Sequence, residues 1–526
     1  MKSNSVIGYG GEYHDSNIAI ISREGKIDSV VSEERFTRVK KDGSIPFSSL
    51  SYYGLRDLPD QAIIGTSDWR NQRTVAAVQM QKRFPQSDSF LFTGHHRAHC
   101  ASAYYTSGFE NAIVVSMDGG SFFEPWSTTI HEGKGNELFE KHSSEECFTH
   151  SYFFTTALLG FTPNKHEGKI TGLAAHGKHS DEYYDWLEQE NNGGKNLAHA
   201  ITEWVPKNSK NGLEMVIDVE ALQKYKERWK HVTKEDIAFT VQEFTENKVT
   251  EFIAKQARVK YKNIALAGGL FANVKLNQKI MDLGFENIYV HPGMGDEGLG
   301  LGAALSVVKP YPFTLKHVFF GPGYSDDQML FKIIECGLNY SVPNYMFETL
   351  ATLLAEGKVI ARYTGRTEYG PRALGNRSIL YQTTDKTVND WLNKRLKRTE
   401  FMPFAPITLE EHAHECYENI EGSQYTMKFM TITKDCTALM KRLSPAVVHI
   451  DGTARPQLVD KDNAMLYGVL SEYHKLTGIP SLINTSFNNH GEPIVNSPQD
   501  AVASFLSSGL DYLAMGPYLI QNPKLK

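Results

Sequence analysis

Two strand–turn–strand units of similar chemistry constrain the fold of this chain more than any other feature. The first spans residues 6–21, where apolar runs flank a polar turn rich in Gly, Asp and Ser, and residues 27–32 could form a third strand. The second lies about a hundred residues later, at residues 114–131. One such hairpin carries little information, because polar turns with Gly and Asp are common. The pair predicts a duplicated α/β unit.

In domains of the ribonuclease-H or actin kind, two such hairpins face each other across a nucleotide. Glycine-rich strand-to-helix turns follow at residues 268–269 and 293–298. Packing alone would explain either turn, but two in succession at the carboxyl ends of strands are where open α/β sheets bind nucleotides. Gly168 and Gly172, with a lysine between them, also suit close approach to phosphate, although Walker spacing is absent. We expect nucleotide contacts from Lys169, Gly268, Gly269, Asn273 and Asn277.

Size and composition describe an ordinary globular protein of more than one domain. The 526 residues are 41% hydrophobic and 22% charged, and the net charge of −6 gives no support to a broad nucleic-acid face. The five cysteines are scattered and fit reduced thiols. No signal-peptide core or membrane span is evident, so we expect a soluble, cytoplasmic protein. The pattern breaks near residues 315–345, which predicts domains at 1–325 and 326–526.

A second constraint comes from the helical segment that begins near His95. His95 and His99 are four residues apart, so their imidazoles share one helix face and could supply half of a metal's ligands. An apolar strand stops at Asp118, where a third ligand could be aimed, and the glycine-rich loop at Asp296 offers a fourth. The simpler interpretation is helix capping and packing. The density of polar motifs around these residues favours the metal site.

Residues 33–42 carry charges of both signs in a short stretch. On composition alone, a solvated helix end with ion pairs is the better interpretation. The functional alternative is that Lys40 holds an anionic or polar substrate near His14.

The last two hundred residues contain an unusual density of cationic loops. Four arginines lie within residues 362–377, with one acid among them and no helical stripe. Arginine matches phosphate bidentately, so this loop is typical of polyanion binding. Basic residues follow at 394–398, and polar loops at 449–457 and 484–489 could be satisfied turns. Together these loops favour a site for ATP and a phosphate compound.

These residues belong to motifs that closely resemble the O-carbamoyltransferases, the family of the nodulation-factor, cephalosporin, ansamycin and aminoglycoside enzymes. The motifs run in order from residue 6 to about residue 518. They read HHRAHCASAYY, VSMDGG, HEGKITGLAAHG, AGGLFANVKLN, HPGMGDEGLGLGAAL, GRTEYGPRALGNRS, RTEFMPFAP, HIDGTARPQ and INTSFNNHGEPIV. The resemblance implies an actin-like N-terminal domain similar to the metal protein that transfers threonylcarbamoyl to tRNA. It also implies a YrdC-like C-terminal domain that makes a carbamoyl-adenylate.

The resemblance also assigns roles to residues of this sequence. His95, His99, Asp118 and Asp296 match metal ligands, most often described as holding iron, and His14 and Lys40 match residues at the acceptor hydroxyl. The residues that match the carbamoyl phosphate and ATP site are Arg366, Arg372, Arg377, Arg398, Arg455, Ser486 and Asn488. Lys394 and Lys397 both qualify for the lysine of that site's Lys-x-Arg motif.

The implied reaction uses ATP, Mg²⁺ and carbamoyl phosphate to make carbamoyl-adenylate, and then moves the carbamoyl group to a hydroxyl. Arginines and a divalent cation are needed because two highly charged anions must meet. The acceptor is open: a sugar or antibiotic hydroxyl is the family default, and a hydroxymethylated base or nucleotide is an alternative. Other interpretations are a sugar-kinase-like phosphotransferase, an actin-like ATP-gated binding protein, and a threonylcarbamoyl enzyme acting on tRNA. Oligomeric state is not readable from the sequence.

Overall fold

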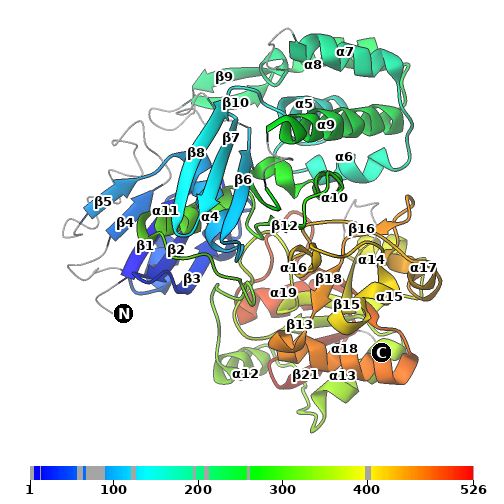
Figure 1. Cartoon of the computed structure of the whole chain (residues 1–526). Coiled ribbons are helices and arrows are strands. Elements are labelled where there is room, and N and C mark those ends of the chain that lie inside the picture. Colours follow the sequence, from blue (N-terminus) through cyan, green and yellow to red (C-terminus); the bar gives the residue numbers. More distant parts are fainter. Residues whose placement is uncertain are drawn as a thin grey trace.

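The structure is a computed structural model, which describes residues 5–11, 14–55, 63–66, 89–119, 126–192, 197–206, 213–256, 261–396 and 404–524 (Figure 1). We refer to residues 1–325 as the N-terminal part and to residues 326–526 as the C-terminal part. In the described residues, no helix is both long and apolar enough to cross a membrane.

Two five-stranded sheets organise the N-terminal part. The first has the order β3-β2-β1-β4-β5, with β1–β2 and β2–β3 antiparallel and β1–β4 and β4–β5 parallel. The second repeats this pattern as β8-β7-β6-β11-β12, with the same strand directions. The predicted duplication is therefore confirmed.

The strands of the first sheet are β1 (Ser5–Gly10), β2 (Asn17–Ser22), β3 (Ile27–Ser32), β4 (Ile63–Thr66) and β5 (Ser89–Phe92). Those of the second are β6 (Asn111–Met117), β7 (Thr128–Lys134), β8 (Glu137–Ser144), β11 (Asn263–Ala267) and β12 (Asn287–Val290).

Helices α4 (His95–Tyr105) and α11 (Leu299–Val308) join the two sheets. Helix α11 packs on β1, α4 packs on β6, and the two helices pack on each other. The glycines of α11 make this contact possible: a Cβ at Gly302 would lie 1.9 Å from the Ala98 carbonyl oxygen, and one at Gly300 would lie 2.5 Å from Asn17 Oδ1. The Gly-Leu-Gly-Leu-Gly pattern is therefore explained by helix packing.

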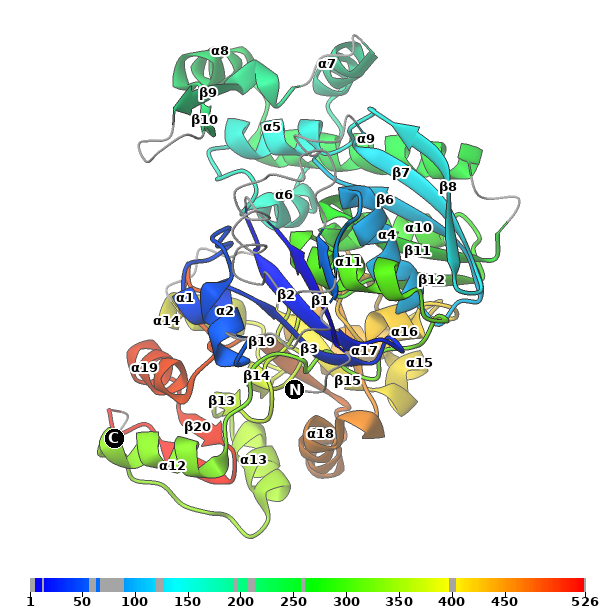
Figure 2. The ribbon, with the colours of Figure 1, turned by 90° about the vertical axis from the view of Figure 1, so that its left-hand side faces the viewer.

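A helical excursion, which the sequence patterns did not predict, covers one end of the second sheet (Figures 1 and 2). It contains α5 (His150–Leu158), α6 (Glu167–Ala174), α7 (Asp181–Asn192), the hairpin β9 (Thr202–Pro206) with β10 (Leu213–Ile217), α8 (Val219–Trp229) and α9 (Lys234–Gln256). These helices bury a separate core that includes Tyr183, Trp186 and Trp229. Helix α10 (Val274–Met281) follows β11.

The C-terminal part is built on a mixed seven-stranded sheet, in the order β18-β15-β19-β14-β13-β20-β21. Its strands are β13 (Ile360–Tyr363), β14 (Arg377–Gln382), β15 (Ala405–Leu409), β18 (Gln457–Val459), β19 (Ser481–Ser486), β20 (Tyr512–Met515) and β21 (Tyr518–Gln521), and β16 (Lys434–Asp435) pairs with β17 (Thr453–Ala454). The whole chain thus has a mixed α/β fold. A YrdC-like identity and a boundary at residue 325 stay predictions.

The helices of the C-terminal part are α12 (Asp326–Glu335), α13 (Met346–Ala355), α14 (Val388–Arg395), α15 (Ala413–Cys416), α16 (Gln424–Met427), α17 (Ala438–Leu443), α18 (Ala464–Thr477) and α19 (Pro498–Ser508).

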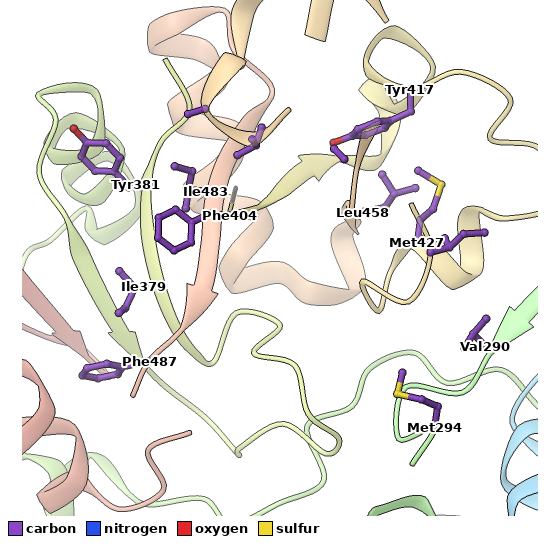
Figure 3. Packing of buried hydrophobic residues seen from close by; sticks show 14 of the residues in the cluster. Val290, Met294, Ile379, Tyr381, Phe404, Tyr417, Met427, Leu458, Ile483 and Phe487 are labelled. Carbon is purple, nitrogen blue, oxygen red and sulfur yellow. The ribbon is translucent and has the colours of Figure 1, made fainter. Parts of the chain in front are cut away.

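The two parts share a continuous apolar core. Val290 and Met294 of the N-terminal part belong to the same buried cluster as Met427 and Ile483 of the C-terminal part (Figure 3). At roughly 25 cal/mol for each Å² of buried apolar surface, such a shared core opposes independent movement of the two parts.

Residues 33–42 also connect the parts, through α1 (Glu34–Thr37) and the turn after it. Arg35 is buried and donates to the Gly370 carbonyl at 2.9 Å. Arg38 donates to the carbonyls of Pro493 and Ile494 at 2.8 and 2.7 Å. The interpretation of this stretch as a solvated helix end is therefore wrong, because its arginines satisfy main-chain acceptors of the C-terminal part.

Candidate functional site

Four side chains from three separate segments meet between the two five-stranded sheets. His95 and His99 stand one turn apart at the start of α4, with their Nε2 atoms 3.2 Å apart. Asp118 follows β6 directly, and Asp296 begins the short helix η3 (Asp296–Gly298). His99 Nε2 lies 3.1 Å from Asp118 Oδ2 and 3.5 Å from Asp296 Oδ1. Ligand atoms of all four lie within 4.8 Å of one another, as a metal site requires.

The glycine pair after β11 holds Asp118 in place. Gly269 donates its N–H to Asp118 Oδ2 at 3.1 Å, and Gly119 donates to Oδ1 at 2.6 Å. Gly268 has φ +106°, and a Cβ there would lie 2.1 Å from the Met117 carbonyl oxygen. Close packing on β6 therefore explains this turn, for which we predicted nucleotide contacts.

The charges within the cluster are mutually dependent. Burial alone would lower the pKa of His99, but Asp118 and Asp296 raise it to about 9. Burial would raise the pKa of Asp118, and the two histidines lower it well below its usual range. Two imidazole nitrogens and two carboxylates are a donor set that suits a divalent transition metal, so the residues fit the metal that the resemblance implied.

His14 and a lysine lie beside this cluster. His14 Nε2 is 3.6 Å from Asp296 Oδ2, and its Nδ1 is 2.9 Å from Asp15 Oδ2. Lys41 Nζ lies 3.6 Å from the same Asp15 oxygen, whereas Lys40 is exposed. Burial would lower the pKa of His14, but Asp296 and Asp15 raise it to about 9. The geometry favours Lys41 over Lys40 as the lysine at this site.

Glu297 connects the cluster to the C-terminal part. We call residues 291–298 the Asp296 loop and residues 364–376, between β13 and β14, the arginine loop. Burial, followed by the carboxylate of Asp15, raises the pKa of Glu297 to about 7. Glu297 also acts electrostatically on Lys41 and on Arg372 of the arginine loop. The two loops therefore adjoin.

Arg372 and Arg455, which we call the arginine pair, are neighbouring arginines that have no hydrogen-bond acceptor among the described residues. Burial, together with the charge of Arg372, lowers the pKa of Arg455 well below its usual range. Within the part of the chain that the structure describes, neither guanidinium makes a hydrogen bond or ion pair, and Nε of Arg372 is buried without a partner. Two adjacent cations in this state require an anion, and a bidentate phosphate suits them.

The other two predicted arginines of this region have structural partners. Arg377 is fully buried, donates to the carbonyls of Thr364, Gly365 and Asn376, and lies 3.8 Å from the ring centre of Tyr363. Arg366 donates to the Gly321 carbonyl and to Ser29 Oγ, both at 2.8 Å. These contacts favour a structural role for Arg366 and Arg377 over the predicted contact with phosphate.

The remaining predicted residues are dispersed. Lys394 is exposed on α14, and Lys397 and Arg398 lie outside the described residues. Ser486 ends β19 and donates to Asn488, whose amide donates to the carbonyls of Asn489 and Glu492. These hydrogen bonds are those of a satisfied polar turn, the simpler explanation for this loop.

Three predicted nucleotide contacts also have other surroundings. Lys169 is buried within α6, 5.7 Å from the ring centre of Phe161. Asn273 caps α10 by accepting from Leu276 N–H. Asn277 is fully buried and donates to the carbonyls of Phe271 and Thr431 at 2.7 Å each, so its amide joins the two parts. These positions favour structural roles.

Sequence reasoning missed several residues that shape the site. Asn17 donates to the carbonyls of Asp15 and Asp296, and Tyr369 of the arginine loop reaches His291 of the Asp296 loop. Both were visible as polar residues within motifs: Asn17 stands at the end of the first polar turn, where the second strand begins, and Tyr369 lies between the arginines. Their partners are distant in sequence, so no local pattern indicated them.

Two family descriptions match the chain. "Carbamoyltransferase N-terminus" matches residues 59–305, and "Carbamoyltransferase C-terminus" matches residues 351–522. An uncharacterized protein of Methanocaldococcus jannaschii is 33% identical over 90% of this chain and 80% of its own length. The nodulation protein NolNO of Sinorhizobium fredii is 30% identical over 97% of this chain and 79% of its own.

Among solved structures, component A of the (R)-2-hydroxyglutaryl-CoA dehydratase of Acidaminococcus fermentans aligns with 58% of this chain and 98% of its own. The identity is 15% and the TM-score 0.35, a likeness too low to support a conclusion. The family matches span both parts, and the metal-type cluster and the arginine pair lie within them. The chain belongs to the carbamoyltransferase family and is a carbamoyltransferase.

Proposed function

We propose that this carbamoyltransferase is an ATP-dependent O-carbamoyltransferase with two linked sites. The arginine pair would form carbamoyl-adenylate, and the His–Asp cluster would transfer its carbamoyl group to a hydroxyl of a sugar or other small molecule. One observation carries the proposal: two half-buried arginines, for which the described residues provide no acceptor, adjoin through Glu297 a cluster of four metal-type ligands.

The first step needs cations around two anions. Water hydrolyses carbamoyl phosphate to carbamate and inorganic phosphate, and the carbamate oxygen then attacks the α-phosphorus of ATP, so that the bond between the α-phosphorus and the β-bridging oxygen breaks and pyrophosphate leaves. Arg372 and Arg455 would hold the reacting phosphates and offset the charge that repels them, with Mg²⁺ on the leaving group. Their half-buried position strengthens this attraction, because the local dielectric is lower than that of water.

The second step would occur at the cluster. His95, His99, Asp118 and Asp296 would hold a divalent transition metal, iron by the resemblance, which supplies Lewis-acid polarisation when bound. The acceptor oxygen attacks the carbamoyl carbon, the bond to AMP breaks, and AMP leaves. His14, which lies 3.6 Å from Asp296 at the edge of the cluster, would take the acceptor's proton in its neutral form, because a metal cation on Asp296 would offset the carboxylate charge that raises the pKa of His14. Lys41 would orient the substrate's polar groups.

Two variants separate the steps. Arg372→Ala should abolish pyrophosphate release from ATP and carbamoyl phosphate while metal content stays at the wild-type level, and Arg442→Ala, an exposed arginine of α17, serves as its control. His14→Ala should keep pyrophosphate release and lose transfer to pooled hydroxylated acceptors, measured as a mass gain of one carbamoyl group. Loss of both activities in His14→Ala would refute the division of labour. ADP as the product would instead support a kinase-like reaction.

A further inference from the structure

A buried hydrogen bond joins the arginine loop to the Asp296 loop. The hydroxyl of Tyr369 lies 2.9 Å from Nε2 of His291, and both side chains are buried. The Tyr369 hydroxyl fills the space above two glycines of the Asp296 loop: a Cβ would lie 2.3 Å from it at Gly293 and 3.1 Å from it at Gly298. The Asp296 loop is therefore shaped to receive this tyrosine.

The contact continues to the helix that carries the histidines. His291 Nδ1 lies 3.0 Å from Oγ1 of Thr106, the residue that follows α4 as its C-cap. The Thr106 hydroxyl donates its single hydrogen to the Ser102 carbonyl at 2.6 Å, so it can only accept from His291. The His291 ring therefore donates from Nδ1 to Thr106 and accepts at Nε2 from the Tyr369 O–H. Burial lowers the pKa of His291 to about 3, so the neutral ring that this arrangement needs is the stable form.

We call the hydrogen-bonded chain Tyr369–His291–Thr106 the relay. It contacts every segment that bears a metal-type ligand except the end of β6, which Asp118 follows. Its first member belongs to the arginine loop with Arg372, its second to the loop with Asp296, and its third to the helix with His95 and His99. A shift of the arginine loop would have to break the relay or move Asp296 with it. The relay thus ties the anion site to the cluster by directed bonds, in addition to apolar packing.

We propose that Tyr369 is a positioning residue that couples the two sites. Its hydrogen bond to His291 fixes the position of the arginine pair relative to the His–Asp cluster. The carbamoyl-adenylate therefore passes from one site to the other without release to water. This inference rests on the proposed function. It goes beyond it by assigning the coupling to a residue that touches neither the phosphates nor the metal ligands.

The test measures retention of the intermediate against its formation. Metal-loaded enzyme is mixed with ATP and carbamoyl phosphate labelled at carbon, without an acceptor, and is separated from free solutes by rapid gel filtration. The measured ratio is the amount of enzyme-bound label divided by the amount of pyrophosphate released. Tyr369→Phe should lower this ratio about tenfold, the effect of losing one buried hydrogen bond, and should leave pyrophosphate release within about twofold. Tyr417→Phe is the matched control, because its buried hydroxyl lies 2.7 Å from Thr408 Oγ1 within the C-terminal part.

A second variant tests the relay at its far end. Thr106→Val removes the acceptor of His291 and leaves the arginine loop unchanged, so it should lower the ratio in the same direction. The double variant should be no worse than the stronger single one, since both act through one chain of bonds. Thr106→Val also replaces Tyr369→Phe if that variant does not fold, as judged by its melting temperature.

The outcomes are distinct. An unchanged ratio in Tyr369→Phe, or additive effects in the double variant, would overturn the coupling role and leave the proposed function standing. A parallel loss of the ratio in Tyr417→Phe would mean that the effect is one of general stability, and it would overturn the inference as well. Absence of pyrophosphate release from the wild-type enzyme would overturn the proposed function itself.

Discussion

Asn17 donates a hydrogen bond of 2.8 Å from its side-chain amide to the main-chain carbonyl of Asp296. The oxygen of the same amide accepts from Gly300 N–H at 2.9 Å, so both ends of Asn17 hold the segment that presents the Asp296 carboxylate. The first sheet is thereby fixed to a candidate metal ligand 279 residues away in the sequence.

Asn17→Ala should weaken metal binding about tenfold to a hundredfold, because residues that orient a ligand contribute to affinity on that scale. The measurement is metal content and a titration with ferrous or zinc ion. Asn263→Ala is the control, since its amide also joins two segments, but at the opposite end of β11, where it donates to Asn111. Equal metal affinity in the two variants would contradict this role for Asn17.

The two kinds of arginine should differ in stability. Arg377→Ala should lower the free energy of unfolding by about 3 kcal/mol, because it leaves buried carbonyls without donors. Arg372→Ala should change it by less than about 1 kcal/mol or raise it, since it removes one of two adjacent cations that lack acceptors. Urea unfolding of both variants measures the difference. A loss in Arg372→Ala as large as that in Arg377→Ala would show that Arg372 is a folding residue.

The sequence predicted those features that depend on local patterns. The alternation of apolar residues with Gly and Asp turns indicated the duplicated sheets, and the spacing of His95 and His99 indicated a shared helix face. The strand end at Asp118 and the glycine-rich loop at Asp296 were each expected to present a ligand, and both carboxylates lie in one cluster with the two histidines.

Composition gave no information on which polar groups satisfy one another. Arg372 and Arg377 lie five residues apart in one motif, yet Arg377 donates to three carbonyls and Arg372 has no acceptor among the residues that the structure describes. We predicted Lys40 for the site beside His14, whereas Lys41 is the lysine that lies 3.6 Å from Asp15. Such outcomes depend on tertiary contacts.

Lys41 should therefore matter more than Lys40 for transfer. Lys41→Met removes the cation 3.6 Å from Asp15 and should lower carbamoyl transfer to hydroxylated acceptors by tenfold or more, on the scale of about 1.4 kcal/mol. Pyrophosphate release should persist, because the arginine pair is untouched. Lys40→Met, at the exposed neighbour, is the control. If Lys40→Met loses transfer and Lys41→Met retains it, the assignment from the resemblance is right and the geometric one is wrong.

A buried histidine outside the site should make the fold acid-sensitive. His131 on β7 is 1% exposed. Among the described residues neither of its ring nitrogens has a hydrogen-bond partner, and the Glu140 carboxylate is 3.9 Å from Nε2. Burial, with a smaller contribution from Arg97, lowers the pKa of His131 from 6.5 to about 3.

Between pH 3 and 6.5 the unfolded chain therefore binds a proton at His131 that the folded chain does not. The contribution of neutral His131 to the free energy of unfolding is fully present above pH 6.5. It falls by about 1.4 kcal/mol for each pH unit below that value. His131→Leu should remove this component, so that the loss of unfolding free energy between pH 7 and pH 5 becomes about 2 kcal/mol smaller than in the wild type. Urea unfolding at the two pH values measures it, with the exposed His414→Leu as control. The same pH dependence in His131→Leu and the wild type would show that His131 is protonated in the folded protein.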